Sequence, residues 1–345
     1  MMEEYKRLGP DEAAEFIKGT RSALVLCHTN PDGDAIGSAE ALCGVIRALG
    51  GTAKIASPSA VPERLEFLAA GEDTSYVRGD EDRYDRLISI DVASRNQLGD
   101  LAHLADKVDL MIDHHASGDA FADNIVIPEA SAAGEIVFEI YKMLVSSGDI
   151  PTDVGVCRAA FGAISSDTGS FKYSNTTPKT FRLAAELTEI INGANDGGLS
   201  ICDISRLLHD TLSEKDLRIN AAVAERIRLY EDGALAVFAI DADDMASLGV
   251  TEADLGGASD IVRTLRGVLV ALTLRQRDGE ERSFKLSSRA NAEIDVAAVC
   301  RNFGGGGHVR AAGASVKAAS LEDALDAVVP AFSEAIRKYR GESAT

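Results

Sequence analysis

Residues 23–50, "ALVLCHTNPDGDAIGSAEALCGVIRALG", decide the fold class of this protein. A short apolar run is followed by a turn rich in Asn, Pro, Asp and Gly, and then by a helical pattern of apolar residues. A strand, a turn and a helix in this order form the first half of the unit from which parallel sheets are built. The turn also holds His28, Asp32 and Asp34, so it has more polar groups than a turn alone requires.

The same alternation of strand and helix continues through the first half of the chain. The chain has four further short apolar runs, at 53–57, 87–90, 108–112 and 124–128, and helical patterns such as residues 35–50 and 132–144. The sequence therefore predicts an α/β fold, with a mostly parallel sheet and helices on both faces.

A change of composition divides the chain. Residues 193–203 are rich in Gly, Asn and Asp, and the strands that follow gather around a hairpin that turns at Asp278-Gly279. We expect a first domain at residues 1–192, a linker at 193–213 and a smaller α+β domain at 214–345. The active site is expected in the cleft between the two domains.

Charge and composition exclude several classes of protein. The chain of 345 residues has a net charge of −20, whereas a protein that grips long duplex nucleic acid should be basic. No apolar run approaches the roughly 20 residues of a membrane span, and the polar N-terminus is unlike a signal peptide. The five cysteines are scattered without a CxxC pair, which is typical of a cytoplasmic protein.

Three predicted strands of the first domain end in side chains that bind metals. The run at 23–27 leads into the histidine and aspartates of the turn, the run at 87–90 leads into Asp91, and the run at 108–112 leads into Asp113, His114 and His115. In a parallel sheet these positions share the carboxyl edge, where such folds bind ligands. Three of the six histidines lie at this edge, so we expect one site there.

Each of these residues also has a plain structural explanation. Asp34 precedes a helical pattern and could cap that helix, and Asp32 with Gly33 is a common turn. Asp91 could be a loop carboxylate, and His28 a buried imidazole. Of the three histidines outside the cluster, His103 and His209 are interpreted as surface residues. The combined pattern favours a shared site over these separate explanations.

The residue types indicate which metal would bind. Asp167 follows a helix in "AISSDTGSFKYS" and adds another carboxylate to the candidate set. Several carboxylates with imidazoles and no thiolate suit Mn²⁺, with Mg²⁺ or Co²⁺ as possible substitutes. The set is too large for one ion, and a pair of ions about 3.5–4 Å apart would use it for attack on phosphorus.

The second domain contributes a glycine run, Gly304 to Gly307, followed by His308 and Arg310. We expect the run to be a loop with open backbone amides, and Arg289 lies upstream of it. Glycine-rich backbone with His and Arg is typical of an anion or nucleotide site, although the run alone could be a flexible loop.

Taken together, these motifs resemble the DHH phosphoesterase superfamily. The stretches that carry the resemblance are "HTNPDGDAIGS", "SIDVAS", "DHH", "SDTGSF" and "FGGGGHVRAAGA", in the expected order over nearly the whole chain. The sequence is most similar to the NrnA-type branch of short two-domain enzymes. The resemblance implies hydrolysis of nanoRNA of about two to five nucleotides and of 3′-phosphoadenosine 5′-phosphate (pAp), by two-metal-activated attack of hydroxide.

The resemblance also implies a role for each residue. One Mn²⁺ would take His28, Asp32 and Asp91, and the second would share Asp91. The second ion's remaining ligands would be Asp34, His114 and Asp167. Asp113 would orient the cluster, and His115 would face the scissile phosphate. The terminal phosphate and nucleotide would be bound by Arg289, Gly304, Gly305, Gly306, Gly307 and His308.

One departure and one alternative accompany this interpretation. Relatives often carry Arg where this chain has Gln97, which leaves any substrate contact of that Arg open. The alternative activity is a stand-alone phosphodiesterase for cyclic di-AMP or linear dinucleotides. The expected partners are short single-stranded RNA or small nucleotides, without a membrane, and the protein could be a homodimer.

Overall fold

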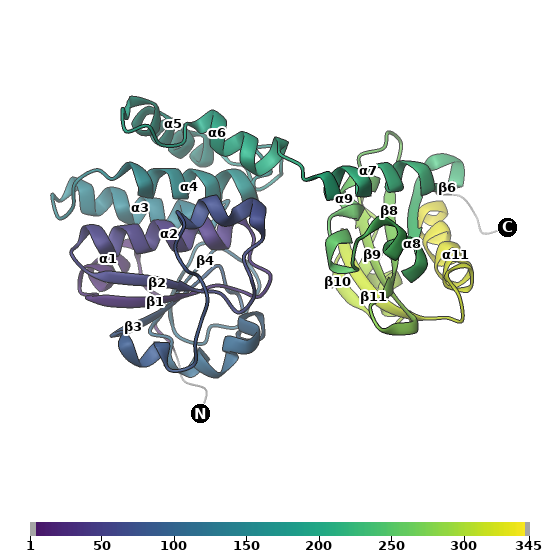
Figure 1. The fold of residues 1–345 in the computed structure, drawn as a ribbon, viewed down its shortest axis with the longest axis horizontal. Coiled ribbons are helices and arrows are strands. Elements are labelled where there is room, and N and C mark those ends of the chain that lie inside the picture. The colour runs from purple at the N-terminus through teal and green to yellow at the C-terminus, as the bar shows by residue number, and fades with distance from the viewer. Residues whose placement is uncertain (1–4, 342–345) are drawn as a thin grey trace. The chain divides into compact units, whose positions relative to one another are not determined.

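The computed structural model describes residues 5–341, apart from the side chain of residue 281. The chain forms two compact units, and the division falls between Thr211 and Leu212. This point lies inside the stretch 193–213 where the sequence predicts a linker. No helix within residues 5–341 is long and apolar enough to cross a membrane. Figure 1 shows the elements of each unit.

The first unit contains a sheet of five strands, all parallel, in the order β2-β1-β3-β4-β5. Each apolar run predicted from the sequence forms one of them, so the predicted α/β class is confirmed. The bounds are β1 Ser22–Leu26, β2 Thr52–Ala56, β3 Arg86–Ile90, β4 Leu110–Asp113 and β5 Asp123–Val126.

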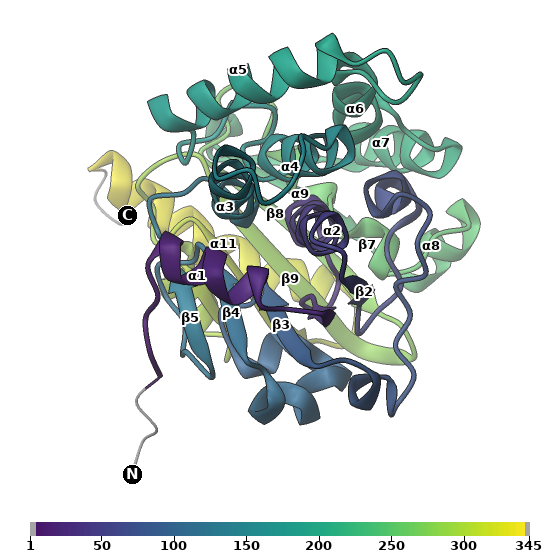
Figure 2. The same ribbon diagram turned by 90° about the vertical axis from the view of Figure 1, so that its left-hand side faces the viewer.

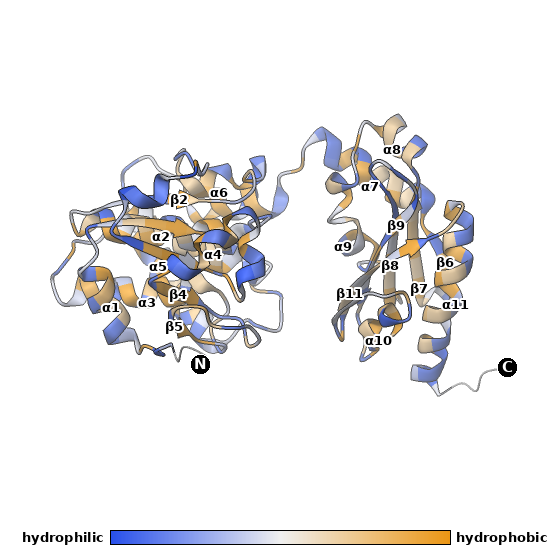
Figure 3. Cartoon of the chain, turned by 90° about the horizontal axis from the view of Figure 1, so that it is seen from below, coloured by the Kyte–Doolittle hydropathy of each residue, from blue (hydrophilic) through white to orange (hydrophobic). Residues whose placement is uncertain are grey.

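Alternate strand residues pack on opposite faces of this sheet, as the pleat of a strand requires. Val25 joins the large apolar core under the helices, whereas Leu24 and Leu26 join a smaller core on the other face. Figure 3 shows the hydrophobic colour concentrated on this sheet and on α2. The helices of the first unit are α1 Pro10–Lys18, α2 Gly33–Ala48, α3 Ala133–Ser146, α4 Val154–Asp167, α5 Pro178–Gly193 and α6 Ile201–Ser205.

The two faces of the sheet are covered differently. Figure 2 shows α1, α2 and α3 beside one face, with α4 and α5 stacked further out. The second face is covered by the 3-10 helical segment η3, Arg95–Lys107, whose direction changes at Gly99. Shorter turns complete the unit: η1 Glu63–Ala69, η2 Asp80–Arg83 and the π-helical turn η4 Arg206–Asp210.

The second unit contains a mixed sheet of six strands in the order β10-β11-β9-β8-β7-β6. Only β7 and β8 pair in parallel. The predicted hairpin is confirmed, because β8 and β9 pair across Asp278-Gly279, and Gly279 has a φ of +74°. The strand bounds are β6 Arg228–Tyr230, β7 Leu235–Ile240, β8 Val270–Arg277, β9 Glu280–Ala290, β10 Gly306–His308 and β11 Ala311–Lys317.

Helices cover the two faces of the second sheet unequally. On one face, α10 and α11 share an apolar core with β7, β8, β9 and β11. On the other, α7, α8 and α9 form a smaller core that reaches only β7 and β8. The bounds are α7 Glu214–Arg226, η5 Glu231–Gly233, α8 Ala242–Leu248, η6 Ala253–Leu255, α9 Ala258–Val262, α10 Val296–Arg301 and α11 Leu321–Arg340.

Candidate metal centre

The predicted ligands converge at the carboxyl edge of the first sheet. β1 and β3 are neighbours although β2 lies between them in the sequence, so the strand order changes direction between them. Parallel sheets bind ligands at such a point, because the loops on its two sides lead away from each other. His28 follows β1, Asp91 follows β3, Asp113 ends β4, and His114 comes directly after it.

A first group contains His28, Asp32 and Asp91, whose candidate ligand atoms all lie within 4.8 Å of one another. The Nε2 atom of His28 is 3.8 Å from Oδ1 of Asp32 and 3.5 Å from Oδ2 of Asp91. This is the set that the family resemblance assigns to one ion.

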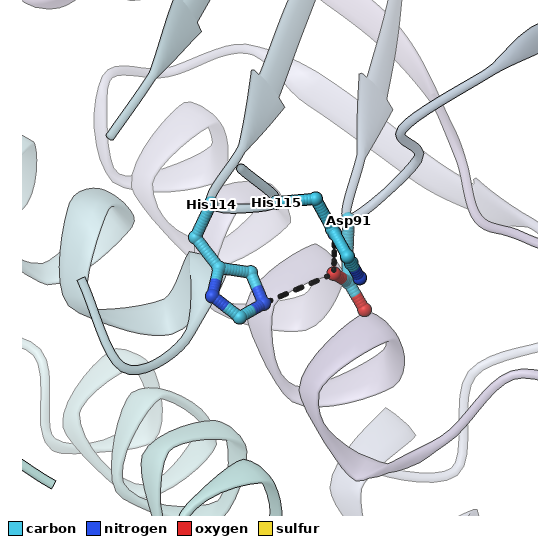
Figure 4. Close-up of side chains that lie close together, drawn as sticks. All are labelled: Asp91, His114 and His115. Carbon is cyan, nitrogen blue, oxygen red and sulfur yellow. Dashed lines mark ion pairs between the residues drawn. The ribbon is translucent and has the colours of Figure 1, made fainter. Parts of the chain in front are cut away.

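A second group contains Asp34, His114 and Asp167, within the same limit of 4.8 Å. The Nε2 atom of His114 is 3.6 Å from Oδ2 of Asp34 and 3.7 Å from Oδ2 of Asp167. It is also 3.6 Å from Oδ1 of Asp91. Figure 4 shows the consecutive residues His114 and His115 both beside Asp91.

Asp91 belongs to the first group, contacts His114 of the second, and forms a further group of candidate ligands with His114 and His115. Its Oδ2 faces His28 and its Oδ1 faces His114. The residue is 2% exposed, and Oδ1 has no hydrogen-bond partner among the described residues. A buried carboxylate oxygen without a donor is costly, so this atom is suited to contact a cation.

The Nε2 atoms of the two imidazoles face these carboxylates. Nδ1 of His28 lies 2.9 Å from the carbonyl oxygen of Thr29, and Nδ1 of His114 lies 3.2 Å from that of Ala130. A carbonyl can only accept, so Nδ1 carries the proton and Nε2 of a neutral ring points its lone pair at the carboxylates. Ligating histidines in metalloproteins have this arrangement. The residues therefore fit a pair of divalent cations.

Protons partly neutralise the cluster when it holds no metal. Burial raises the pKa of Asp34 well above its usual range, and nearby Asp91 adds to this effect. Burial also raises the pKa of Asp167 to about 6. Burial lowers the pKa of His28 and His114, but their neighbouring carboxylates outweigh it and bring both values to about 10. Metal ions would displace these protons.

Asp113 holds the two histidines that follow it. Its buried Oδ1 accepts from the backbone N–H of His114 at 2.8 Å and of His115 at 3.3 Å. The same oxygen lies 2.8 Å from Nδ1 of His115, and this contact raises the pKa of that imidazole. Asp113 is thus tied to the backbone and ring beside it, and Nε2 of the half-exposed His115 is left for another partner.

The capping explanation for Asp34 is wrong, because Asp32 caps α2. Oδ1 of Asp32 accepts from the N–H groups of Asp34 and Ala35, both at 3.0 Å. Asp34 instead accepts from the N–H of Ala133 at 2.7 Å and of Gly134 at 3.1 Å, at the start of α3. It therefore joins two helices at the site.

Two nearby residues were missed or misjudged from the sequence. Nδ2 of Asn175 donates to Oδ2 of Asp167 at 3.1 Å and to the backbone oxygens of Asp167 and Ser131, both at 3.0 Å. No spacing pattern marks this asparagine. His209 is not a surface residue: it is half-buried, its Nε2 lies 3.0 Å from Oγ of Ser165, and burial lowers its pKa.

The candidates of the second unit lie on three neighbouring strands. His308 pairs with Ala311, and Ala311 pairs with Arg289, so His308 and Arg289 share one row and one face of the sheet. The glycine run is not entirely a loop, because Gly306 and Gly307 begin the edge strand β10. Glycines can pair in a strand because the pairing uses only backbone groups. Gly305 lies so close to β11 that a Cβ at this position would be 2.1 Å from the carbonyl oxygen of Gly313.

Comparison with known proteins gives two family matches. Residues 22–158 match the DHH family, N-terminal domain, and residues 232–336 match the DHHA1 domain. The first match contains every candidate ligand except Asp167. The second contains Arg289, the glycine run and His308.

Relatives of similar length align over most of the chain. The chain is 27% identical to the bifunctional oligoribonuclease and PAP phosphatase NrnA of Thermus thermophilus, over 94% of both proteins. It is 26% identical to the protein of the same name in Bacillus subtilis, over 84% of this chain and 87% of the relative. An exopolyphosphatase-related protein from Bacteroides fragilis has the same fold, with a TM-score of 0.81, 23% identity and 96% of both chains covered.

Proposed function

Because the chain belongs to the DHH family of phosphoesterases and carries a DHHA1 domain, we propose that it hydrolyses short oligoribonucleotides such as pApA, and also pAp. The names of the relatives from Thermus thermophilus and Bacillus subtilis, which include both activities, support these substrates. The observation that carries the proposal is the position of Asp91, a buried carboxylate between two groups of metal-binding side chains.

In this proposal two Mn²⁺ ions bind at the candidate metal centre. His28 and Asp32 would hold one ion, Asp34, His114 and Asp167 would hold the other, and Asp91 would contribute a ligand to each. Such a pair supplies activation of a water and neutralisation of charge on the phosphate. Two divalent cations would also offset locally the repulsion between a phosphate and a chain of net charge −20.

The remaining residues position the substrate. Asp113 fixes the imidazole of His115, whose free Nε2 can donate to an oxygen of the scissile phosphate. Arg289 and His308, in one row of the second sheet, bind the terminal phosphate together with amides of the glycine run. The described cysteines are all free and four of the five are buried, which supports a reducing cytoplasm as the place of action.

The test compares wild type with Asp91→Ala after removal and return of Mn²⁺, on pApA, pAp and cyclic di-AMP. We expect wild type to cleave pApA and pAp, and we expect Asp91→Ala to lose at least about 100-fold in turnover. Its bound Mn²⁺, counted by equilibrium dialysis, should also fall. Asp82→Ala, which removes an exposed carboxylate elsewhere in the first unit, is the matched control and should keep full activity.

Two results would contradict the proposal. Full activity of Asp91→Ala would exclude a metal pair that shares this residue. Faster hydrolysis of cyclic di-AMP than of pApA by wild type would reverse the order of substrates.

A further inference from the structure

Part of one face of the second sheet lies outside the apolar core that the helices form on that face. Phe284 and Leu286 of β9 and Val316 of β11 point into the core beneath α10 and α11. The residues between them on these strands must point the other way. The apolar core on that other face reaches β8 but includes no residue of β9 or β11. We call this part of the sheet, over β9 and β11, the open face.

Three cross-strand pairs, each with at least one small residue, form the floor of the open face. Ser287 pairs with Gly313, Lys285 pairs with Ser315, and Arg289 pairs with Ala311. All six residues are half-exposed or exposed. No bulky apolar group stands among them, so an extended chain can lie along the strands.

Positive charge lines this floor. Arg275 of β8 pairs in register with Lys285, and Glu252 lies 3.4 Å from the first and 3.1 Å from the second. One carboxylate between two cations leaves a surplus positive charge. Arg275 is 2% exposed and its Nε has no partner among the described residues, so the exposed charge of this trio is that of Lys285.

Arg277 extends the charged row across the hairpin. Its guanidinium donates to Oγ of Ser315 at 2.7 Å, so the side chain crosses β9 and reaches β11. Arg289 lies four residues from Lys285 along β9, about 13 Å at the rise of a strand. Neither Arg277 nor Arg289 forms an ion pair with a carboxylate among the described residues, in a chain whose net charge is −20.

We propose that Arg277 and Lys285 bind the phosphodiester backbone of longer oligoribonucleotides, in which an internal phosphate takes the place at Arg289 that the terminal phosphate of a dinucleotide occupies. The open face then favours substrates longer than a dinucleotide, and a mononucleotide such as pAp does not reach it. The occupant follows from charge complementarity: a polyanion suits a row of cations with surplus charge and a floor of small polar residues. This inference rests on the proposed function and adds a preference for substrate length.

The experiment compares Lys285→Gln and Arg277→Gln with wild type on pAp, pApA and a five-nucleotide RNA. We expect kcat/KM for the five-nucleotide RNA to fall by about fivefold in each variant, the scale of one partly exposed charge contact, and to stay unchanged for pAp. The slope of log KM against log salt for the long substrate should become shallower by about 0.7 for each cation removed.

Arg282→Gln is the matched control. Arg282 is an exposed cation on the same strand, but its place in the alternation puts it on the face of Phe284 and Leu286. It should change neither the rate nor the salt slope. If Lys285→Gln destabilises the fold because Glu252 loses a partner, Arg277→Gln still tests the open face.

Unchanged kinetics on the five-nucleotide RNA in both variants would overturn the inference, and so would an equal loss on pAp. Failure of wild type to cleave any of the three substrates would instead refute the proposed function. Fluorescence anisotropy of a labelled five-nucleotide RNA, measured with chelator present, tests the open face in that case. Binding weakened by Lys285→Gln and Arg277→Gln but not by Arg282→Gln supports the open face, and equal binding by all variants refutes it.

Discussion

Asp91 combines a strained backbone conformation with the central position in the candidate metal centre. Its φ is +56°, in the left-handed region that residues with a Cβ rarely adopt, and its N–H donates to the carbonyl of Ile112 at 2.9 Å. Such strain persists where the surrounding structure fixes the backbone, and it is common at functional sites. Here it accompanies a carboxylate that faces His28 on one side and His114 on the other.

Asn175 donates a hydrogen bond to the candidate metal ligand Asp167, so its substitution tests how that ligand is positioned without removing the ligand. Asn175→Ala removes the donor to Asp167 and leaves buried acceptors unpaired. We expect Mn²⁺ affinity to fall by about 10- to 100-fold and the free energy of unfolding to fall by about 1–3 kcal/mol. Asn291→Ala is the control, because Nδ2 of Asn291 also donates to two backbone oxygens, but in the second unit.

Asn291→Ala should lower the stability without changing Mn²⁺ affinity. Calorimetric titration with Mn²⁺ and chemical denaturation measure the two effects. Equal Mn²⁺ affinity of Asn175→Ala and wild type would show that this asparagine does not position Asp167.

Mn²⁺ binding should release protons. The pKa values of His28 and His114 are about 10 without metal, so both rings are protonated at pH 6–9 and must lose a proton to bind. Affinity should therefore rise with pH, by up to about tenfold per unit for each ring, and level off above the folded pKa values. Titration in buffers of different ionisation enthalpy counts the protons, and His114→Ala should release fewer. Affinity independent of pH between 6 and 8 would contradict this assignment.

At the scale of elements, the contact between α2 and α4 sets the distance between ligands. The N-terminal end of α2 carries Asp34, and α4 ends at Asp167. The two helices meet at Gly37, where a Cβ would lie 2.7 Å from the carbonyl oxygen of Ala159 and 2.9 Å from the backbone N of Ala163. Backbone atoms cannot move aside as a side-chain tip can, so this contact requires glycine.

Gly37→Ala should therefore separate the two helices. Alanine gains about 1 kcal/mol of helix propensity over glycine, but the overpacking costs about 1–3 kcal/mol and displaces Asp34 from Asp167. We expect lower stability together with weaker Mn²⁺ binding. Gly193→Ala is the control, because a Cβ there meets nothing within 4 Å, and it should be neutral or stabilising. Thermal unfolding with and without Mn²⁺ measures both variants, and unchanged Mn²⁺ affinity of Gly37→Ala would contradict the coupling.

At the scale of the whole molecule, the two units have separate cores and separate chemistry. The apolar clusters of the first unit contain no residue beyond 208, and those of the second begin at 219. Every group of potential metal ligands among the described residues lies in the first unit. The phosphate-binding candidates Arg289 and His308 lie in the second.

Metal should therefore stabilise one unit selectively. Mn²⁺ should raise the unfolding temperature of the first unit, which scanning calorimetry of the full chain measures. When free Mn²⁺ is 100 times its dissociation constant, the free energy of unfolding of this unit should increase by about 2.7 kcal/mol. The transition of the second unit should stay in place. Asp91→Ala should abolish the shift. Equal shifts of both transitions would show that metal binding is not confined to the first unit.

The α/β class and the set of candidate ligands follow from the sequence alone. Apolar runs of strand length alternate with helical patterns, and this periodicity depends only on local burial. The three loops after β1, β3 and β4 were also predictable as one cluster, because parallel strands present their carboxyl ends at one edge. The sequence did not show α8 and α9, which are short and carry little periodicity.

Which atoms face each other depends on the three-dimensional fold and could not be predicted from local patterns. Asp32 caps α2, and Asp34 instead accepts hydrogen bonds at the start of α3. Which aspartate acts as the cap depends on the position of α3, which is distant in the sequence. The fold brought Asn175 to Asp167 and His209 to Ser165 by contacts that leave no pattern in the sequence. It also placed Lys285 and Arg277 on one open face, since strand register, not spacing along the chain, aligns residues across a sheet.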